Sequence, residues 1–159
     1  MDFPFEIPER TEFSDDGYGI LGRAIAFATD FEGNCRAFAT LIGLKSEPEI
    51  LRDQKTIDEF CKFIERRRLS TNLRTIEEKL RLPEEVATVL IKGREARNYL
   101  AHEAGLALKN ILEIDDRRQD FVNNVKSKVR DLAEANLVVV FISNLATNEP
   151  NPTANYLKQ

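Results

Sequence analysis

Residues 18–44 read YGILGRAIAFATDFEGNCRAFATLIGL, and this stretch decides the fold class. Its apolar residues recur at steps of three and four, at Leu21, Ala24, Phe27, Ala28, Phe31, Cys35, Phe38 and Ile42. This period places them along one side of an α-helix, where aromatic residues usually belong to a protein core. The spacing therefore predicts one long amphipathic helix, which Ser14 or Asp15 can cap and which the segment KSEPE at 45–49 ends.

The rest of the chain repeats this helical pattern. Apolar positions at helical spacing run over residues 57–80, over 86–108 and, from a start near Asp115–Asp116, over 121–142. The segment RRRLST at 66–71 is a point where the second helix can split, with Ser70 or Thr71 as the new cap. The run LVVVFI at 137–142 has strand propensity, but its continuity with the preceding period favours a helix buried on most sides, as at a subunit contact. These patterns predict an all-α, up-and-down bundle of four to five amphipathic helices.

The two ends of the chain lack this pattern. Residues 1–13 contain two prolines and no helical period, so we expect an extended N-terminal arm that docks on the body or frays. Residues 148–159 form a polar tail marked by prolines. Residues 14–147 between them make one helical domain, because 159 residues is the usual length of a single domain with a proper core.

The composition excludes several classes of protein. With 42% apolar and 31% charged residues, the chain is typical of a soluble globular protein. Its start has no secretory signal, and its longest apolar run, residues 137–142, is too short to cross a bilayer, so we expect a cytoplasmic protein without membrane contact. Cys35 and Cys61 fall on apolar stripes, which predicts buried, reduced thiols. One histidine, two scattered cysteines and no glycine-rich phosphate loop predict neither a metal site nor a cofactor.

The charge is unevenly distributed along the chain. The net charge of −4 argues against strong nonspecific binding to nucleic acid. Residues 1–16 hold six acids and one base, so the remainder is close to neutral, while residues 62–81 carry seven bases and three acids. In that basic segment, Arg66, Arg67 and Arg68 are candidate RNA-binding residues; a solvated helix end is the competing interpretation.

The only histidine of the chain lies in the segment RNYLAH, Arg97 through His102. This segment resembles the R-x-x-x-x-H signature of HEPN domains, including the polar residue that usually follows the arginine. The resemblance covers the motif, the chain length and the helical layout. It implies a small α-helical bundle that forms a homodimer and cleaves RNA without a metal, often as a toxin paired with an antitoxin protein. It also implies that Arg97, Asn98 and His102 are the catalytic residues.

The resemblance stops short of one regulatory feature. HEPN toxins that a partner nucleotidyltransferase inactivates typically carry a tyrosine two residues beyond the histidine. This chain has Ala104 at that position, which argues against such adenylylation.

The chemistry of RNA cleavage fits these residue types independently. RNA carries its own nucleophile, the 2′-hydroxyl group, so the reaction needs only a base, an acid for the 5′-oxygen and a cation near the phosphorane. An imidazole can act as acid or base near neutral pH. A guanidinium group binds two phosphate oxygens at once. His102 and Arg97 therefore suit the reaction, and Asn98 can orient the phosphate or the imidazole.

Helix geometry adds a constraint on how these residues act. On an ideal helix Arg97 and His102 diverge by about 140°, so they do not share one face. Asn98 and His102 are only about 40° apart, and Arg94 extends their stripe by one turn as a candidate substrate-binding residue. Because each chain has one imidazole, catalysis by two imidazoles requires two chains whose motifs meet at a twofold interface. We therefore expect a composite active site in a homodimer, although a single imidazole assisted by water or Arg97 remains an alternative.

Plainer interpretations of the motif compete with catalysis. His102 can be a surface imidazole paired with Glu95 or Asn98, and Arg97 can form an ion pair with an acid of a neighbouring helix. In that case the same fold serves as a non-catalytic nucleotide- or protein-binding regulatory module. A helical protein whose exposed faces serve only assembly is a third possibility.

Overall fold

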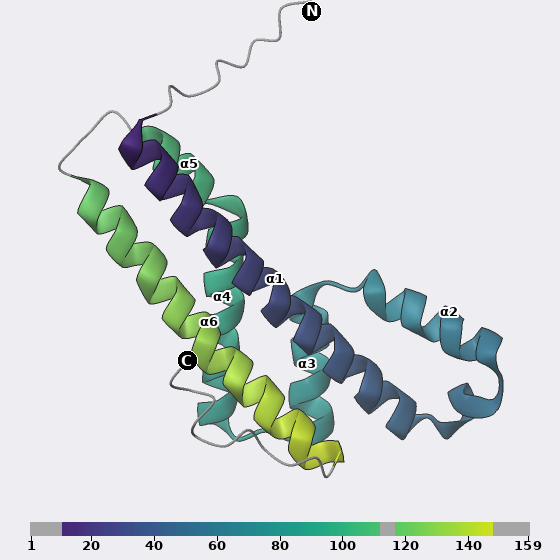
Figure 1. Cartoon of the computed structure of the whole chain (residues 1–159). Coiled ribbons are helices and arrows are strands. Elements are labelled where there is room, and N and C mark those ends of the chain that lie inside the picture. Colours follow the sequence, from purple (N-terminus) through teal and green to yellow (C-terminus); the bar gives the residue numbers. More distant parts are fainter. Residues whose placement is uncertain (1–10, 112–116, 148–159) are drawn as a thin grey trace, which may run out of the picture.

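The computed structural model describes residues 11–111 and 117–147, which form helices and no strand (Figure 1). In chain order these are α1 (Glu12–Ser46), the 3-10 helix η1 (Pro48–Arg52), α2 (Gln54–Glu65), α3 (Leu69–Leu80), α4 (Glu84–His102), α5 (Ala104–Ile111) and α6 (Arg118–Thr147). Successive helices reverse direction, except that α5 continues the course of α4. The predicted all-α bundle is therefore confirmed. The described part has six α-helices rather than four to five.

Helix α1 is the central helix of the described bundle. It is 35 residues long, and Figure 1 shows α6 beside it and α4 behind. It packs against α3, α4, α5 and α6, and its buried aromatic residues Phe31 and Phe38 belong to one core cluster with residues of those helices, including Leu73, Ile76, Leu100, Leu108, Val125 and Leu132. A hydrogen bond of 2.8 Å from Asn34 Nδ2 to Asn136 Oδ1 also ties α1 to α6. These contacts fix the middle of α1, and with it Glu32, against α4.

The start of α1 differs from the sequence prediction. Thr11, not Ser14 or Asp15, is the N-cap: its Oγ1 accepts from the Ser14 backbone N–H at 3.1 Å, and Ser14 Oγ accepts from the Thr11 N–H at 2.8 Å. This reciprocal capping box satisfies two backbone donors and begins the helix earlier than the apolar stripe alone indicates. Residues 12 and 13 belong to α1, so the prediction of an extended arm over residues 1–13 is wrong for these two residues. The rest of that arm, the tail at 148–159 and the predicted start at Asp115–Asp116 lie outside the described residues.

Two junctions place the motif and the basic segment. The helix predicted for 57–80 splits into α2 and α3, but the new cap is Arg68, whose backbone carbonyl accepts from the Thr71 and Asn72 N–H groups, and neither Ser70 nor Thr71. The apolar stripe continues to Leu108 as predicted, but the helix that carries it is divided at Glu103, where φ is −112° and ψ is −36°. The interruption ends α4 at His102 while Ala104 and Leu108 remain fully buried on α5.

The second half of α6 is less buried than the sequence predicts. The run at 137–142 is helical, as expected, and Val139 is 1% exposed. However, Leu137 is 42%, Phe141 50% and Leu145 57% exposed. These three residues are spaced four apart, so they form one solvent-facing stripe, and only the opposite side of the helix packs into the core.

Candidate active site

Three separate parts of the chain form a hollow of about 330 Å³ around the arginine–histidine motif. The last turns of α4, the start of α3 and the middle of α1 line it, with Arg94, Arg97, Asn98 and His102 from α4, Arg68, Leu69 and Ser70 from the α3 start, and Glu32 from α1. Arg68, Arg94, Arg97, Asn98 and His102 were candidates from the sequence. The fold therefore brings five candidate residues to one hollow.

Arg97 is held by a carboxylate of the neighbouring helix α1. Its Nε and Nη2 both donate to Glu32 Oε2, at 2.9 and 2.6 Å, and the two side chains are 24% and 20% exposed. The other oxygen of Glu32 accepts from Arg36 Nη2 at 3.4 Å. Partial burial makes this charged hydrogen bond stronger than an exposed ion pair, so Arg97 is firmly oriented. The ion pair considered for Arg97 from the sequence is thus present.

The remaining nitrogen of Arg97 faces the other two motif residues. Nη1 donates to Asn98 Oδ1 at 3.2 Å and lies 3.4 Å from His102 Nε2. The divergence expected between Arg97 and His102 holds only for the helix backbone, because the long arginine side chain folds back to the imidazole. A guanidinium group has no acceptor, so this contact is a hydrogen bond only when His102 Nε2 is unprotonated and accepts. No bond within the described part of the chain joins His102 to Glu95 or Asn98.

Two further arginines of the hollow have no acidic partner. Among residues 11–111 and 117–147, no carboxylate forms an ion pair with Arg68 or Arg94, and Arg94 is half-buried on α4. With Arg97 they bring three guanidinium groups to a hollow that contains one carboxylate, Glu32. The hollow therefore has an excess of positive charge and free donors suited to a phosphate.

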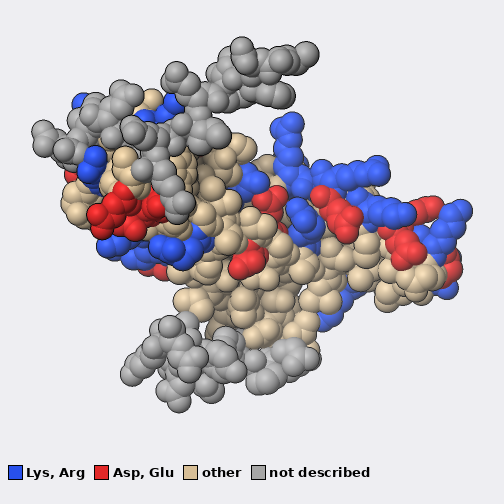
Figure 2. Space-filling view, turned by 45° about the horizontal axis from the view of Figure 1, so that its top comes forward, with Lys and Arg blue, Asp and Glu red and all other residues tan. Residues whose placement is uncertain are grey.

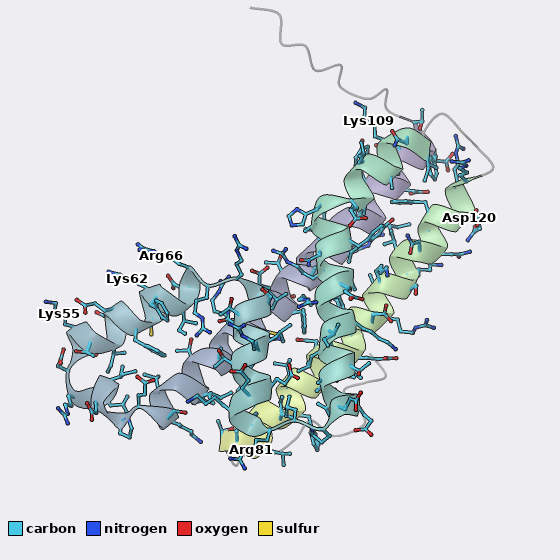
Figure 3. The ribbon with its side chains drawn as sticks, turned by 180° about the vertical axis from the view of Figure 1, so that it is seen from behind. Lys55, Lys62, Arg66, Arg81, Lys109 and Asp120 are labelled. Atoms are coloured by element: carbon cyan, nitrogen blue, oxygen red, sulfur yellow. The ribbon has the colours of Figure 1, made fainter. Side chains whose placement is uncertain are left out.

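The other two candidate RNA-binding arginines, Arg66 and Arg67, do not line this hollow. Arg67 Nη2 donates to Thr75 Oγ1 at 2.6 Å, and its guanidinium lies 5.6 Å from the centre of the Phe63 ring. Figure 3 shows Arg66 on the outer edge of α2, pointing away from the bundle with Lys62. Figure 2 shows basic side chains, interspersed with acidic ones, over the half of the molecule that contains α2. Of the three arginines predicted to bind RNA, only Arg68 therefore lies beside the motif.

No protein-family model, curated protein or solved structure significantly matches this chain. Its site must be interpreted from its own geometry. Within the described helices, none combines the length and apolar character needed to pass through a membrane. The described residues also contain no group of three or more His, Cys, Asp or Glu side chains placed to bind a metal ion.

Two charged residues were missed in the sequence: Glu32, which lines the hollow, and its partner Arg36. Glu32 follows the buried Phe31, and Arg36 lies one helical turn further along α1. An acid and a base four positions apart beside an apolar stripe indicate a charged contact near the core, so the sequence did contain a signal for this pair. Ser70 carried no such signal, since its place follows from how α3 meets α4.

The cysteines do not supply a nucleophile to this site. Burial, together with the negative charge of Glu32, raises the pKa of the Cys35 thiol to about 12. Cys35 therefore stays protonated at neutral pH, and only the thiolate is a good nucleophile. Cys61 is partly exposed rather than buried, which corrects the sequence prediction, and it does not line the hollow.

Proposed function

We propose that the protein is a HEPN-like endoribonuclease that cleaves RNA by metal-independent transesterification. The observation that supports this most directly is the meeting of Arg97, Asn98 and His102 in one hollow with Arg68 and Arg94, two arginines without an ion pair among the described residues. A backbone phosphate in this hollow would contact guanidinium groups while its ribose lies near the imidazole. Cations fixed beside a developing phosphorane charge are the main requirement of the reaction.

Each step of the reaction has a candidate group. In the RNA complex, the 2′-hydroxyl replaces Arg97 Nη1 as the partner of His102 Nε2. His102 Nε2 takes the proton of this hydroxyl, the 2′-oxygen bonds to phosphorus, and the bond from phosphorus to the 5′-oxygen breaks. An acid returns a proton to the 5′-oxygen, so the products are a 2′,3′-cyclic phosphate and a 5′-hydroxyl. Arg97 Nη1 stabilises the phosphorane, Asn98 orients the phosphate or the imidazole, and Glu32 keeps the Arg97 guanidinium from swinging away.

The acid of this scheme comes from a second copy of the chain. One chain has a single imidazole, so a base and an acid of this type require a homodimer with both motifs at its interface. His102 is exposed at the end of α4 and therefore accessible to such a partner. An enzyme of this kind suits the role of a cytoplasmic toxin in a toxin–antitoxin or defence system, where an antitoxin protein would block the open hollow.

Cleavage in the presence of a chelator tests the proposal. The purified full chain, incubated with single-stranded RNA in EDTA, should yield fragments that end in a 2′,3′-cyclic phosphate. His102→Ala should lower the rate by at least about 100-fold, the usual contribution of a general acid or base. Lys109→Ala, at the far end of α5 in Figure 3, is the charge control and should retain activity. Absence of His102-dependent cleavage would overturn the proposal.

A non-catalytic module is the second candidate, and the Arg97–Glu32 pair favours it. Glu32 already occupies two nitrogens of Arg97, which leaves that guanidinium less free to bind a substrate. In this case the hollow binds a nucleotide or an acidic peptide through Arg68 and Arg94. The wild-type protein and His102→Ala would then bind RNA equally, and neither would cleave it.

A further inference from the structure

A second hollow of about 310 Å³ lies between α3 and α4. Residues spaced three and four apart line it on each helix, with Ser70, Thr71, Leu73, Arg74 and Glu77 from α3 and Ala87, Leu90, Ile91 and Arg94 from α4. Such spacing means that each helix turns one continuous face toward the hollow. Its volume is at the lower end of the range of about 300–1,000 Å³ for ligand sites, which suits a group the size of a nucleoside.

This hollow adjoins the candidate active site. Ser70 and Arg94 line both hollows, one from each helix. Along α4, Arg97 lies seven positions after Leu90, a rise of about 10 Å. A phosphate, its ribose and the attached base can span that length. A nucleotide whose phosphate lies beside Arg97 can therefore extend its base past Arg94 into the second hollow.

The lining combines an apolar floor with a polar edge. Leu73, Ala87 and Leu90 are buried beneath the hollow, while Ile91 is 42% exposed at its side, and these side chains offer a surface for a flat ring. At the edge, the Glu77 carboxylate has no hydrogen-bond or ion-pair partner among the described residues. A carboxylate with both oxygens free accepts hydrogen bonds from N–H groups.

The neighbouring arginine leaves this carboxylate accessible. Arg74 Nε lies 3.9 Å from Glu78 Oε1, and both side chains are about 70% exposed, at 71% and 70%. An ion pair of this length and exposure is weak, so it does not hold Arg74 across the hollow. The Arg74 guanidinium is instead free to stack on a bound ring, as arginines do in sites for unpaired bases.

We propose that this second hollow binds the base next to the cleaved phosphate and that Glu77 selects guanine. Guanine presents two adjacent donors, N1–H and the N2 amino group, which match the two oxygens of one carboxylate. Uracil, cytosine and adenine lack this pair of donors. The identity of the ligand as RNA rests on the proposed function, whereas the preference for guanine rests on the second hollow itself, the groove between α3 and α4.

Binding to a chain that cannot cleave tests this inference separately from catalysis. The probes are fluorescent hexaribonucleotides, either all-uridine or with a single guanosine at each position in turn, and anisotropy measures their Kd for His102→Ala. The best guanosine-containing probe should bind at least about 5-fold more tightly than all-uridine RNA, as expected for a bidentate contact. Glu77→Gln in the same background should remove that preference. Glu85→Gln, an exposed acid outside the groove, is the matched control and should preserve it.

The sign of the Glu77→Gln effect excludes a simple charge explanation. Removing an acid strengthens nonspecific binding to RNA, so affinity for all-uridine RNA should stay equal or increase while affinity for the guanosine probe decreases. Equal affinity for all probes, or a preference unchanged by Glu77→Gln, would overturn the inference even if wild-type RNA cleavage depends on His102. A Glu77-dependent preference without any cleavage would support the groove and leave the nuclease proposal to fail alone.

Discussion

Arg97 divides its guanidinium between a carboxylate and an imidazole. Glu32 takes Nε and Nη2, and Nη1 is left toward His102 and Asn98. The carboxylate reduces the net positive charge at the site, but it fixes the direction of Nη1, the one guanidinium nitrogen that Glu32 does not bind. A cation that is already oriented need not reorganise as charge develops on the phosphate. In the proposed reaction Arg68 and Arg94, which form no ion pair within the described residues, supply attraction for the RNA, so orientation and attraction come from different arginines.

Arg68 and Arg66 provide a matched test of the hollow at the scale of single residues. Both are arginines at the α2–α3 junction, but only Arg68 lines the hollow, whereas Arg66 points outward (Figure 3). Arg68→Ala should lower kcat/KM for single-stranded RNA by about 3- to 10-fold through loss of a phosphate contact. Arg66→Ala should stay within about twofold of the wild type, as expected for a distant surface charge.

The salt dependence of binding distinguishes these two variants further. Losing one phosphate contact should reduce the slope of log K against log salt by about 0.7 for a single strand. Binding measured from low to moderate salt should show this reduction for Arg68→Ala only. Equal effects of the two variants would mean that the basic segment acts as a diffuse surface and that Arg68 has no special place in the site.

At the scale of helices, Gly93 sets how closely α4 can approach its neighbours. A Cβ at this position would overlap Ala135 Cβ of α6 and lie 3.1 Å from Phe31 Cζ of α1. Gly93→Ala should therefore destabilise the protein by about 1–3 kcal/mol through overpacking, although alanine is the better helix former. Thermal unfolding should show a Tm lower by several degrees.

Gly22 is the control for this substitution. Gly22 lies on α1, the same helix as Phe31, and a Cβ there would have no atom within 4 Å. Gly22→Ala should raise stability by roughly 0.5–1 kcal/mol, because only the helix propensity changes. If Gly93→Ala were as stable as Gly22→Ala, the close packing of α4 against α6 would be wrong, and so would the placement of Arg94 and Arg97.

The helices could be predicted from the sequence because burial imposes a period on each of them. Phe31 and Phe38 are core residues as their spacing indicates. The split near residues 66–71 was expected from Ser70 or Thr71 as a new cap, although the cap is Arg68. The capping box at Thr11 was missed because Ser14 and Asp15 offer equally plausible caps. Local patterns could not reveal the break at Glu103, where the tertiary burial of Ala104 and Leu108 decides the path.

The candidate site was predictable only in part, since it depends on contacts between distant segments. Arg97, Asn98 and His102 are close in the chain and formed a recognisable motif. The Glu32 partner lies 65 positions away from Arg97, and no local period relates the two. The meeting of Arg97 with His102 was missed because helix angles describe Cβ directions and ignore the reach of a long side chain. The second hollow follows from the pairing of α3 with α4, which the sequence leaves open.

At the scale of the whole molecule, the two-imidazole scheme requires a second chain, and mixed dimers can test it. Wild-type protein at fixed concentration is allowed to exchange subunits with increasing amounts of His102→Ala, and RNA cleavage is measured. If base and acid come from different chains, only dimers of two wild-type chains are active. Activity per wild-type chain should then decrease in proportion to the wild-type fraction of the mixture. Lys109→Ala in place of His102→Ala should cause no decrease.

The alternatives give different results in the same titration. If one imidazole suffices in each site, with water or Arg97 as the acid, activity per wild-type chain stays constant as His102→Ala is added. Sedimentation measured at the assay concentration reports whether dimers are present at all. A monomer that cleaves RNA would exclude the composite site, and the acid would then have to come from Arg97 or a bound water within one hollow. A proportional decrease would instead require that the ends of both α4 helices, each carrying an exposed His102, face one another across the twofold axis.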